Sequence, residues 1–422
     1  MDLWHGFACH CLDLTKQNGI LAFIAQNNWT TNAGAKKMRK KIIEESQILQ
    51  MTDFSDYMIF KHETTNSKKS DDGASIQTMV MLFKHSADID NYSFDYRSIV
   101  KGNRKSEKRD MLDLLNKTQT RKTYYLAPTI NRTYYTNRFL TFSGNDDILN
   151  KIAKNKVYFK DEEIAQGIVF PQDFLDKKNQ LKLGRYCVGD GIFGLSEGEK
   201  NNLELTAEEQ KLIKPYFTTE QIHRYFTEKH NRLWLIYTNS SFKQLNSMDA
   251  YPNLKKHLDK FSDIITSDNK PYGLHRARKE QFFKGEKIIS QRKCAEHPTF
   301  SYSDFDCYVT QTFFIIKTLR WNMKFLTGLL NSKVIAYWLR HRGKMQGVNY
   351  QVDKEPLRNI PLPLVLKNQQ QPVIALVNQI LQVKKVNPEA CTNSLEIKID
   401  KLTYKLYGLT DKEIKIIEGQ KI

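Results

Sequence analysis

The hexapeptide GDGIFG, Gly189–Gly194, has the Gly-x-Gly-x-x-Gly spacing with which some proteins bind a dinucleotide or S-adenosylmethionine. That chemistry requires a strand, a tight turn and then a helix whose first amides face the ligand. The following residues, LSEGEKNNLELT, contain another glycine, two asparagines and no apolar repeat at helical spacing. We therefore expect no helix there and interpret the three glycines as part of a structural loop.

Two groups of cysteine and histidine have residue types that could bind a metal. They are HGFACHC, with His5, Cys9, His10 and Cys11, and CAEH, with Cys294 and His297. A closed zinc site needs a second ligand pair at suitable spacing, and neither group has one. The six cysteines are scattered, which is typical of reduced thiols. The sequence therefore predicts no metal site.

Two basic, polar segments have residue types that could bind nucleic acid. Arginine and lysine bind phosphates or guanine, whereas glutamine and asparagine suit adenine. The alternative is that the arginines are solvated or paired with carboxylates such as Glu280 and Glu286. The predicted DNA-binding residues are Tyr272, Arg276, Arg278, Lys279, Arg292 and Lys293 in the first segment, and Arg340, Arg342, Lys344, Gln346, Asn349, Tyr350 and Gln351 in the second.

The charge of the whole chain agrees with a polyanionic partner. The 422 residues include 65 Lys plus Arg against 47 Asp plus Glu, which gives a net charge of +18. Nucleic acid is the partner this favours, although a membrane-surface or ribosomal protein also fits. We find no export signal and no apolar run long enough to span a membrane, so the expected location is the cytoplasm and no membrane partner is expected.

The first 90 residues have the pattern of an α/β domain. A helix is expected over residues 1–17, with Leu3, Phe7, Cys11 and Leu14 on one face. The continuous apolar run Ile20–Ile24 indicates a strand buried on both faces of a parallel sheet. A helix carrying KKMRKKII and strands at Ile48–Phe54 and Ser75–Lys84 follow. Only the later half of such a domain is recognisable, so we expect further elements before residue 1.

The remainder of the chain divides into three parts. Residues 91–150 are expected to form a connector, since the stretch from 101 to 125 is highly charged. Residues 151–365 alternate short apolar segments with turns, which predicts a β-rich mixed domain. Residues 366–422 are expected to be a helical tail, with a stop at Gly408 and a capping box from Thr410 to Glu413.

Several segments together resemble adenine-specific DNA methyltransferases of restriction-modification systems that have a Taq-like C-terminal specificity domain. The segments occur in the family's order and cover nearly the whole chain. They are LDLTKQNGILAFIAQNNW, DYMIF with ASIQTMVMLFK, IKPYFTTEQIHRYF with WLIY, YPNLKKHLDKF, LTGLLNSKVIAYWLRHRG with NIPLPL, and IDKLTYKLYGLTDKEIKIIEG.

The resemblance implies the C-terminal half of a Rossmann-like methyltransferase sheet, followed by a β-rich target-recognition domain and the helical tail. It also implies that Phe60, in DYMIFKH, stacks on a flipped adenine; the alternative is an ordinary core aromatic. The family's catalytic loop contains two adjacent prolines, and this sequence has none. We therefore expect no cofactor in this chain, and S-adenosylmethionine only together with the missing N-terminal half.

The predicted function is sequence-specific binding of duplex DNA by the target-recognition portion of an adenine methyltransferase, which alone is inactive in methyl transfer. One alternative is the second chain of a split methyltransferase, active with a partner that carries the missing half. Another is a degenerate DNA-binding protein. A fused nuclease is not predicted, because the Glu-x-Lys pairs at Glu396 and Glu413 lie in amphipathic tail segments and lack a preceding Pro-Asp strand.

Overall fold

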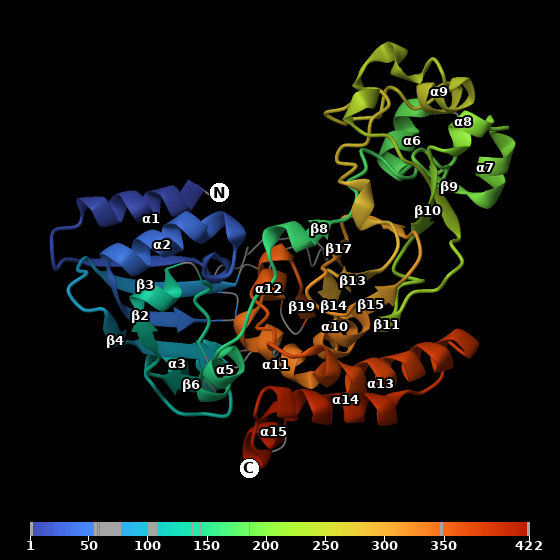
Figure 1. The fold of residues 1–422 in the computed structure, drawn as a ribbon. Helices are drawn as coiled ribbons and strands as arrows, with labels where there is room; N and C mark the ends of the chain where they lie inside the picture. The colour runs from blue at the N-terminus through green and yellow to red at the C-terminus, as the bar shows by residue number, and fades with distance from the viewer. Residues whose placement is uncertain are drawn as a thin grey trace. The chain divides into compact units, whose positions relative to one another are not determined.

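The computed structural model describes residues 3–54, 57, 59, 77–99, 108–136, 138–142, 146–184, 186–346 and 349–419 (Figure 1). The chain divides into two compact units. Unit 1 comprises Met1–Lys151 and Trp338–Asn349, and unit 2 comprises Ile152–Tyr337 and Tyr350–Ile422. As predicted, the fold is mixed α/β with several sheets and a helical C-terminal tail.

Unit 1 contains a five-stranded sheet in the order β1-β3-β2-β5-β6. The strands are β1 (Ile20–Gln26), β2 (Gln47–Asp53), β3 (Thr78–Lys84), β5 (Asp95–Ile99) and β6 (Thr123–Leu126). The β2–β5 pair is parallel, and the other neighbours in this sheet are antiparallel. The region predicted as a connector therefore supplies two strands to the sheet, together with α3 (Lys108–Leu115), β4 (Asn91–Ser93), β7 (Thr129–Asn131), α4 (Arg132–Tyr135) and α5 (Asp146–Ala153).

The prediction that Ile20–Ile24 is buried in a parallel sheet is wrong. Among the described strands, β1 lies at the sheet edge and pairs with β3 alone, in antiparallel register. Leu21 and Phe23 pack on the core, whereas Ile20 and Ile24 remain 62% and 45% exposed. A continuous apolar run cannot by itself distinguish a doubly buried strand from an edge strand with one uncovered apolar face.

The apolar face predicted for the first helix is not the face that the structure buries. Helix α1 (Leu3–Leu14) buries His5, Ala8 and Leu12 against the unit 1 core. The face that carries Leu3, Phe7 and Leu14 is exposed. Helix α2 (Lys36–Glu45) behaves as predicted, because Met38, Ile42 and Ile43 are buried.

Unit 2 contains two larger sheets. The five-stranded one has the order β11-β15-β13-β17-β8, and the four-stranded one has the order β16-β10-β12-β9. A continuous apolar core includes residues from both sheets. The strands are β8 (Ile164–Gln166), β9 (Gly194–Ser196), β10 (Ile213–Phe217), β11 (Tyr225–Phe226), β12 (Leu233–Ile236), β13 (Lys287–Gln291), β15 (Phe300–Ser303), β16 (Tyr308–Val309) and β17 (Phe313–Ile316). The predicted strands at 232–238, 286–291 and 306–317 thus coincide with β12, β13 and the pair β16 and β17.

Helices cover unit 2. The shorter ones are α6 (Lys177–Leu183), α7 (Glu197–Asn202), α8 (Ala207–Gln210), α9 (Pro252–Asp259) and α12 (Lys354–Arg358). Helix α10 (Met323–Leu330) packs on α13 (Lys367–Val386) and α14 (Asn393–Leu406), and Figure 1 shows α13 and α14 side by side. The chain turns at Gly408, where φ is +64°, before α15 (Asp411–Ile417). The Thr410–Glu413 capping box is present at the start of α15, as predicted.

Candidate nucleic-acid interface

Arg278 joins the first predicted DNA-binding segment to the edge of the five-stranded sheet. Its Nη2 donates to Gln166 Oε1 at 2.7 Å, and its Nε donates to the Gly167 carbonyl at 3.3 Å. Gln166 ends β8, which is the edge strand, and Arg278 has a left-handed backbone with φ +67°. The Tyr237 hydroxyl donates to the Arg278 carbonyl at 3.1 Å. Both the backbone and the guanidinium of Arg278 are therefore held in place.

The loop before β17 lies directly against this edge. Gln166 Nε2 donates to the Gln311 carbonyl at 3.4 Å, and the Ile168 amide donates to the Val309 carbonyl at 2.8 Å. A Cβ on Gly167 would lie 2.0 Å from the Thr310 carbonyl oxygen. Glycine is thus required here for close approach of two backbones, and the approach gathers Gln166, Gln311 and the hydroxyls of Thr310 and Thr312.

Arg292 extends the same polar strip. Its amide donates to the Thr312 carbonyl at 2.9 Å, and its Nε donates to Asp353 Oδ1 at 2.6 Å. Gln351 Nε2 donates to the other oxygen of Asp353 at 3.0 Å. In addition, β14 (Lys293–Cys294) pairs with β19 (Asn349–Gln351), with Lys293 opposite Gln351. The structure thus brings together residues that are about sixty positions apart in the sequence.

A polar hollow of about 370 Å³ adjoins the strip. It is lined by hydroxyls, amides and aromatic rings from three segments of unit 2. The lining residues are Ile168, Phe170, Pro171, Gln172, Asp173, Tyr216, Thr218, Thr219, Thr310, Gln311, Thr312 and Phe313. We define the polar strip as Gln166, Arg276, Arg278, Arg292, Lys293, Thr310, Gln311, Thr312 and Gln351.

The strip is positively charged. Burial, together with the nearby charge of Arg276, lowers the pKa of the Arg278 guanidinium. Arginine stays protonated at any physiological pH despite such a shift. Arg276 is exposed, and its backbone pairs with Val169 through two hydrogen bonds of 3.0 and 3.1 Å. Cations and amide groups on a rigid edge can bind phosphates and base edges.

Several predicted residues occupy other positions. Tyr272 and Tyr350 are buried, with 3% and 2% of their surface exposed. The Tyr272 hydroxyl donates to Asp259 at 2.7 Å. A ring that contacts DNA must be exposed, and neither ring is. Lys279 is exposed next to Arg278.

The second predicted segment is divided between the units. Arg340, Lys344 and Asn349 belong to unit 1, as does Arg342, which is buried and donates to the Thr141 carbonyl. Arg340 and Arg342 lie in helix α11 (Lys333–Arg342), and Gln346 ends strand β18 (Met345–Gln346). The side chain of Gln346 and the whole of Phe60 lie outside the described residues.

Sequence reasoning missed the contribution of Gln166, Thr310, Gln311 and Thr312. These are short polar stretches at strand ends, and nothing in their local pattern distinguishes them from ordinary turns. The one available signal was Gly167, because a glycine next to a strand end indicates a close backbone approach.

The GDGIFG segment forms a structural turn. The Gly191 amide donates to Glu199 at 2.7 Å, and the same carboxylate accepts from the amide and hydroxyl of Ser196 at 2.7 Å each. These contacts support the structural interpretation. The expectation that no helix follows is wrong, since α7 opens at Glu197 with a Ser196–Glu199 capping box.

Neither cysteine and histidine group gathers into a metal site in the described part of the chain, where no cluster of three or more His, Cys, Asp or Glu residues has suitable geometry. Among the same residues, no helix is both long enough and apolar enough to cross a membrane.

Comparison with known families agrees with the resemblance found in the sequence. Residues 1–60 match the Eco57I restriction-modification methylase family. Residues 214–362, which include most of the polar strip, match the TaqI-like C-terminal specificity domain. The chain thus resembles restriction-modification methylases over its first 60 residues. Over residues 214–362 it resembles, more particularly, the TaqI-like specificity domain.

One solved structure shows a similar fold, and a second was also matched. The type IIL restriction-modification enzyme MmeI, solved in complex with DNA, is 12% identical, with a TM-score of 0.55 over 99% of this chain. The type IIG restriction endonuclease BpuSI is 12% identical over 96% of this chain, with a TM-score of 0.34. The matches cover 51% and 48% of the two enzymes. This chain therefore spans about half the length of these relatives.

Proposed function

We propose that the chain binds duplex DNA sequence-specifically as the target-recognition portion of an adenine-specific DNA methyltransferase in a restriction-modification system. The observation that carries the proposal is the polar strip, in which three arginines lie with amide and hydroxyl side chains at one end of the five-stranded sheet, where β8 and β13 end and β17 begins. Most of the strip belongs to the TaqI-like region. Such a mixture suits both phosphate binding and base reading. The net charge of +18 and the solved DNA complex of MmeI support it.

Methyl transfer needs a second component. Transfer to an adenine amine requires acceptors that hold the amine and a methyl donor held in line, and both are positioning tasks. This sequence contains neither the adjacent prolines of the family's catalytic loop nor a glycine turn free to bind S-adenosylmethionine, since Gly191 is bound to Glu199. The chain alone is therefore inactive in methyl transfer, and the cofactor binds where the missing half is supplied.

The edge of unit 1 favours a split methyltransferase over a degenerate protein. Along one side, strand β1 pairs with no strand of the described part of the chain, and it carries the exposed Ile20 and Ile24. Edge strands of this kind pair readily with another chain. The occupant we infer is the cofactor-binding half of the methyltransferase sheet, which adds its strands beside β1.

The decisive experiment selects, from a pool of random duplexes, those that the purified chain binds at two salt concentrations, and then sequences them. We expect enrichment of one short motif that contains adenine. The variants R276A and Q311A test the polar strip, and K401A, an exposed lysine on α14, is the matched control. If Arg276 binds a phosphate, R276A weakens binding to all duplexes alike. The slope of the logarithm of the binding constant against the logarithm of the salt concentration then falls in magnitude by about one. If Gln311 reads a base, Q311A relaxes the motif at one position.

Three results would contradict the proposal. Salt-sensitive binding without any enriched motif would mean that the chain binds DNA through its net charge and not through the DNA sequence. If K401A lost as much affinity for DNA as R276A, the polar strip would not be the DNA-binding surface. Incorporation of labelled methyl groups into DNA by the chain alone would disprove its inactivity, whereas incorporation only after addition of the cofactor-binding half would support the split arrangement.

A further inference from the structure

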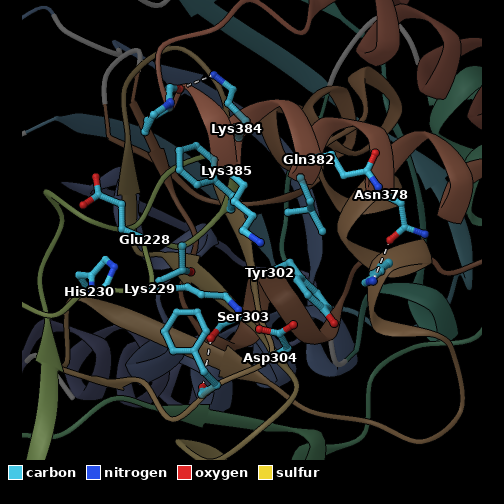
Figure 2. A pocket seen from close by; sticks show the side chains of 16 residues that line it. Glu228, Lys229, His230, Tyr302, Ser303, Asp304, Asn378, Gln382, Lys384 and Lys385 are labelled. Atoms are coloured by element: carbon cyan, nitrogen blue, oxygen red, sulfur yellow. Dashed lines mark hydrogen bonds between the residues drawn. The ribbon is translucent and has the colours of Figure 1, made fainter.

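A second hollow in unit 2 lies at the opposite edge of the five-stranded sheet from the polar strip. It has a volume of about 680 Å³ and is enclosed by β11, the end of β15, α10 and the last turns of α13 (Figure 2). Because the strand order is β11-β15-β13-β17-β8, three strands separate this edge from β8. The hollow is therefore a separate site, and its volume is that of a small-molecule pocket.

Lysines dominate the charge of the pocket. Lys324 donates to Asn378 Oδ1 at 2.7 Å and Lys384 donates to the Pro388 carbonyl at 2.8 Å, so both are oriented by neutral partners. Lys229 and Lys385 are exposed and make no ion pair or hydrogen bond with any described residue. Figure 2 shows these two side chains extending toward the middle of the pocket.

The carboxylates of the pocket do not neutralise the lysines. Glu228 pairs with His223 at 3.0 Å and with Arg232 at 3.6 Å, and Arg232 also pairs with Glu220 at 3.1 Å. Asp304 supplies the other carboxylate. Four lysines against two carboxylates leave a positive pocket. Lys229 and Lys385, which pair with no described residue, are suited to a phosphate.

The remaining walls suit a ring with polar edges. Phe305, Leu381 and the ring of Tyr302 form an apolar surface, and the Tyr302 hydroxyl is turned away to Glu286, to which it donates at 2.8 Å. Asn378 and Gln382 project from α13 toward the same space. Side-chain amides can pair with the edge of a nucleobase, and an aromatic ring can stack on its face.

We propose that this pocket binds a nucleoside triphosphate, with its phosphates between Lys229 and Lys385 and its base against Phe305 and the α13 amides. The inference is independent of the proposed DNA recognition, since it uses neither the polar strip nor its residues. A small ligand is favoured over a duplex because the pocket is concave and small, whereas a duplex needs an extended surface.

The test is titration of the full chain with ATP that carries a fluorophore on the ribose, followed by fluorescence anisotropy. We expect saturable binding that unlabelled ATP abolishes and adenosine does not. K229Q and K385Q each weaken binding about tenfold, because each removes one charge-assisted contact. K229R retains most of the affinity. K367Q changes an exposed lysine at the start of the same helix, α13, and leaves binding unchanged.

Each contrary outcome overturns part or all of the proposal. If K229Q and K385Q bind the labelled ATP as tightly as wild type, the nucleotide does not bind in this pocket. If K367Q loses as much affinity as K229Q and K385Q do, the loss reflects net charge and not a contact in the pocket. Competition by tripolyphosphate as strong as that by ATP overturns the base contact. If duplex DNA displaces the probe and K385Q weakens DNA binding, the pocket is a DNA surface. Thermal melting of each variant separates loss of binding from loss of folding.

Discussion

At the residue scale, Lys287 shows how a buried charge affects this fold. It is fully buried in β13, and its ammonium group donates to the carbonyls of Gly285 and Phe305 at 2.6 and 2.5 Å. Burial lowers its pKa from an ordinary 10.5 to about 8. Desolvation disfavours the charged form, and two neutral carbonyls do not restore the lost hydration.

The substitution K287M should change how stability depends on pH. Between pH 8 and 10.5 the unfolded chain binds more protons at this residue than the folded one, so the wild-type free energy of unfolding gains from this group as pH rises. The gain amounts to about 3 kcal/mol over the full window. In K287M this contribution is absent. Urea unfolding of both proteins at pH 7.5 and 10 measures it, and an identical pH dependence would contradict the assignment.

At the element scale, the contact between the end of β8 and the loop before β17 decides where the polar strip forms. It rests on Gly167, which follows β8 and has no space for a side chain beside Thr310. The distance between the two backbones sets the positions of Gln166 and Gln311. A wider separation would break the hydrogen bond between them, which is already 3.4 Å long.

We therefore expect G167A to destabilise unit 2 by about 1–3 kcal/mol, because the new Cβ forces the two backbones apart. The same variant should lose affinity for the selected DNA motif. The matched control is G198A in α7, where an added Cβ has nothing within 4 Å and the helix gains propensity. Urea midpoints and DNA titrations check both effects. Equal stability of G167A and wild type would show that the loop adjusts freely.

At the scale of the whole molecule, exposed apolar side chains of unit 1 bear on the partner proposed above. The edge strand β1 exposes Ile20 and Ile24, and α1 exposes Leu3, Phe7 and Leu14. Monomeric proteins rarely leave such apolar surface contiguous. Burying it would stabilise an association by about 25 cal/mol for each Å² removed from water.

The purified wild-type chain should self-associate as its concentration rises. The double variant I20K/I24K places charges on the edge strand and should remain monomeric, because inward or edge lysines oppose strand pairing. Sedimentation velocity over a hundredfold range of concentration measures this. L181K, which replaces a single exposed leucine on α6 in unit 2, should associate like wild type. A wild type that is monomeric throughout would contradict the expectation.

The sequence by itself determined the features that depend on composition and local pattern. The charge, the capped tail helices, the inward face of α2 and the ordered segments of the methylase and specificity families can all be read from neighbouring residues. These features depend on composition, on helical periodicity, on a capping box whose two residues are three positions apart, or on the order of motifs along the chain.

Only the tertiary structure decided which residues meet and which faces stay uncovered. Arg278 contacts Gln166 across 112 positions, β1 ends at an edge, and Tyr272 turns inward. The physical reason is that loop closure costs little more for a long loop than for a short one, so many distant pairings compete and packing selects among them. The polar strip and the lysine pocket are products of that selection.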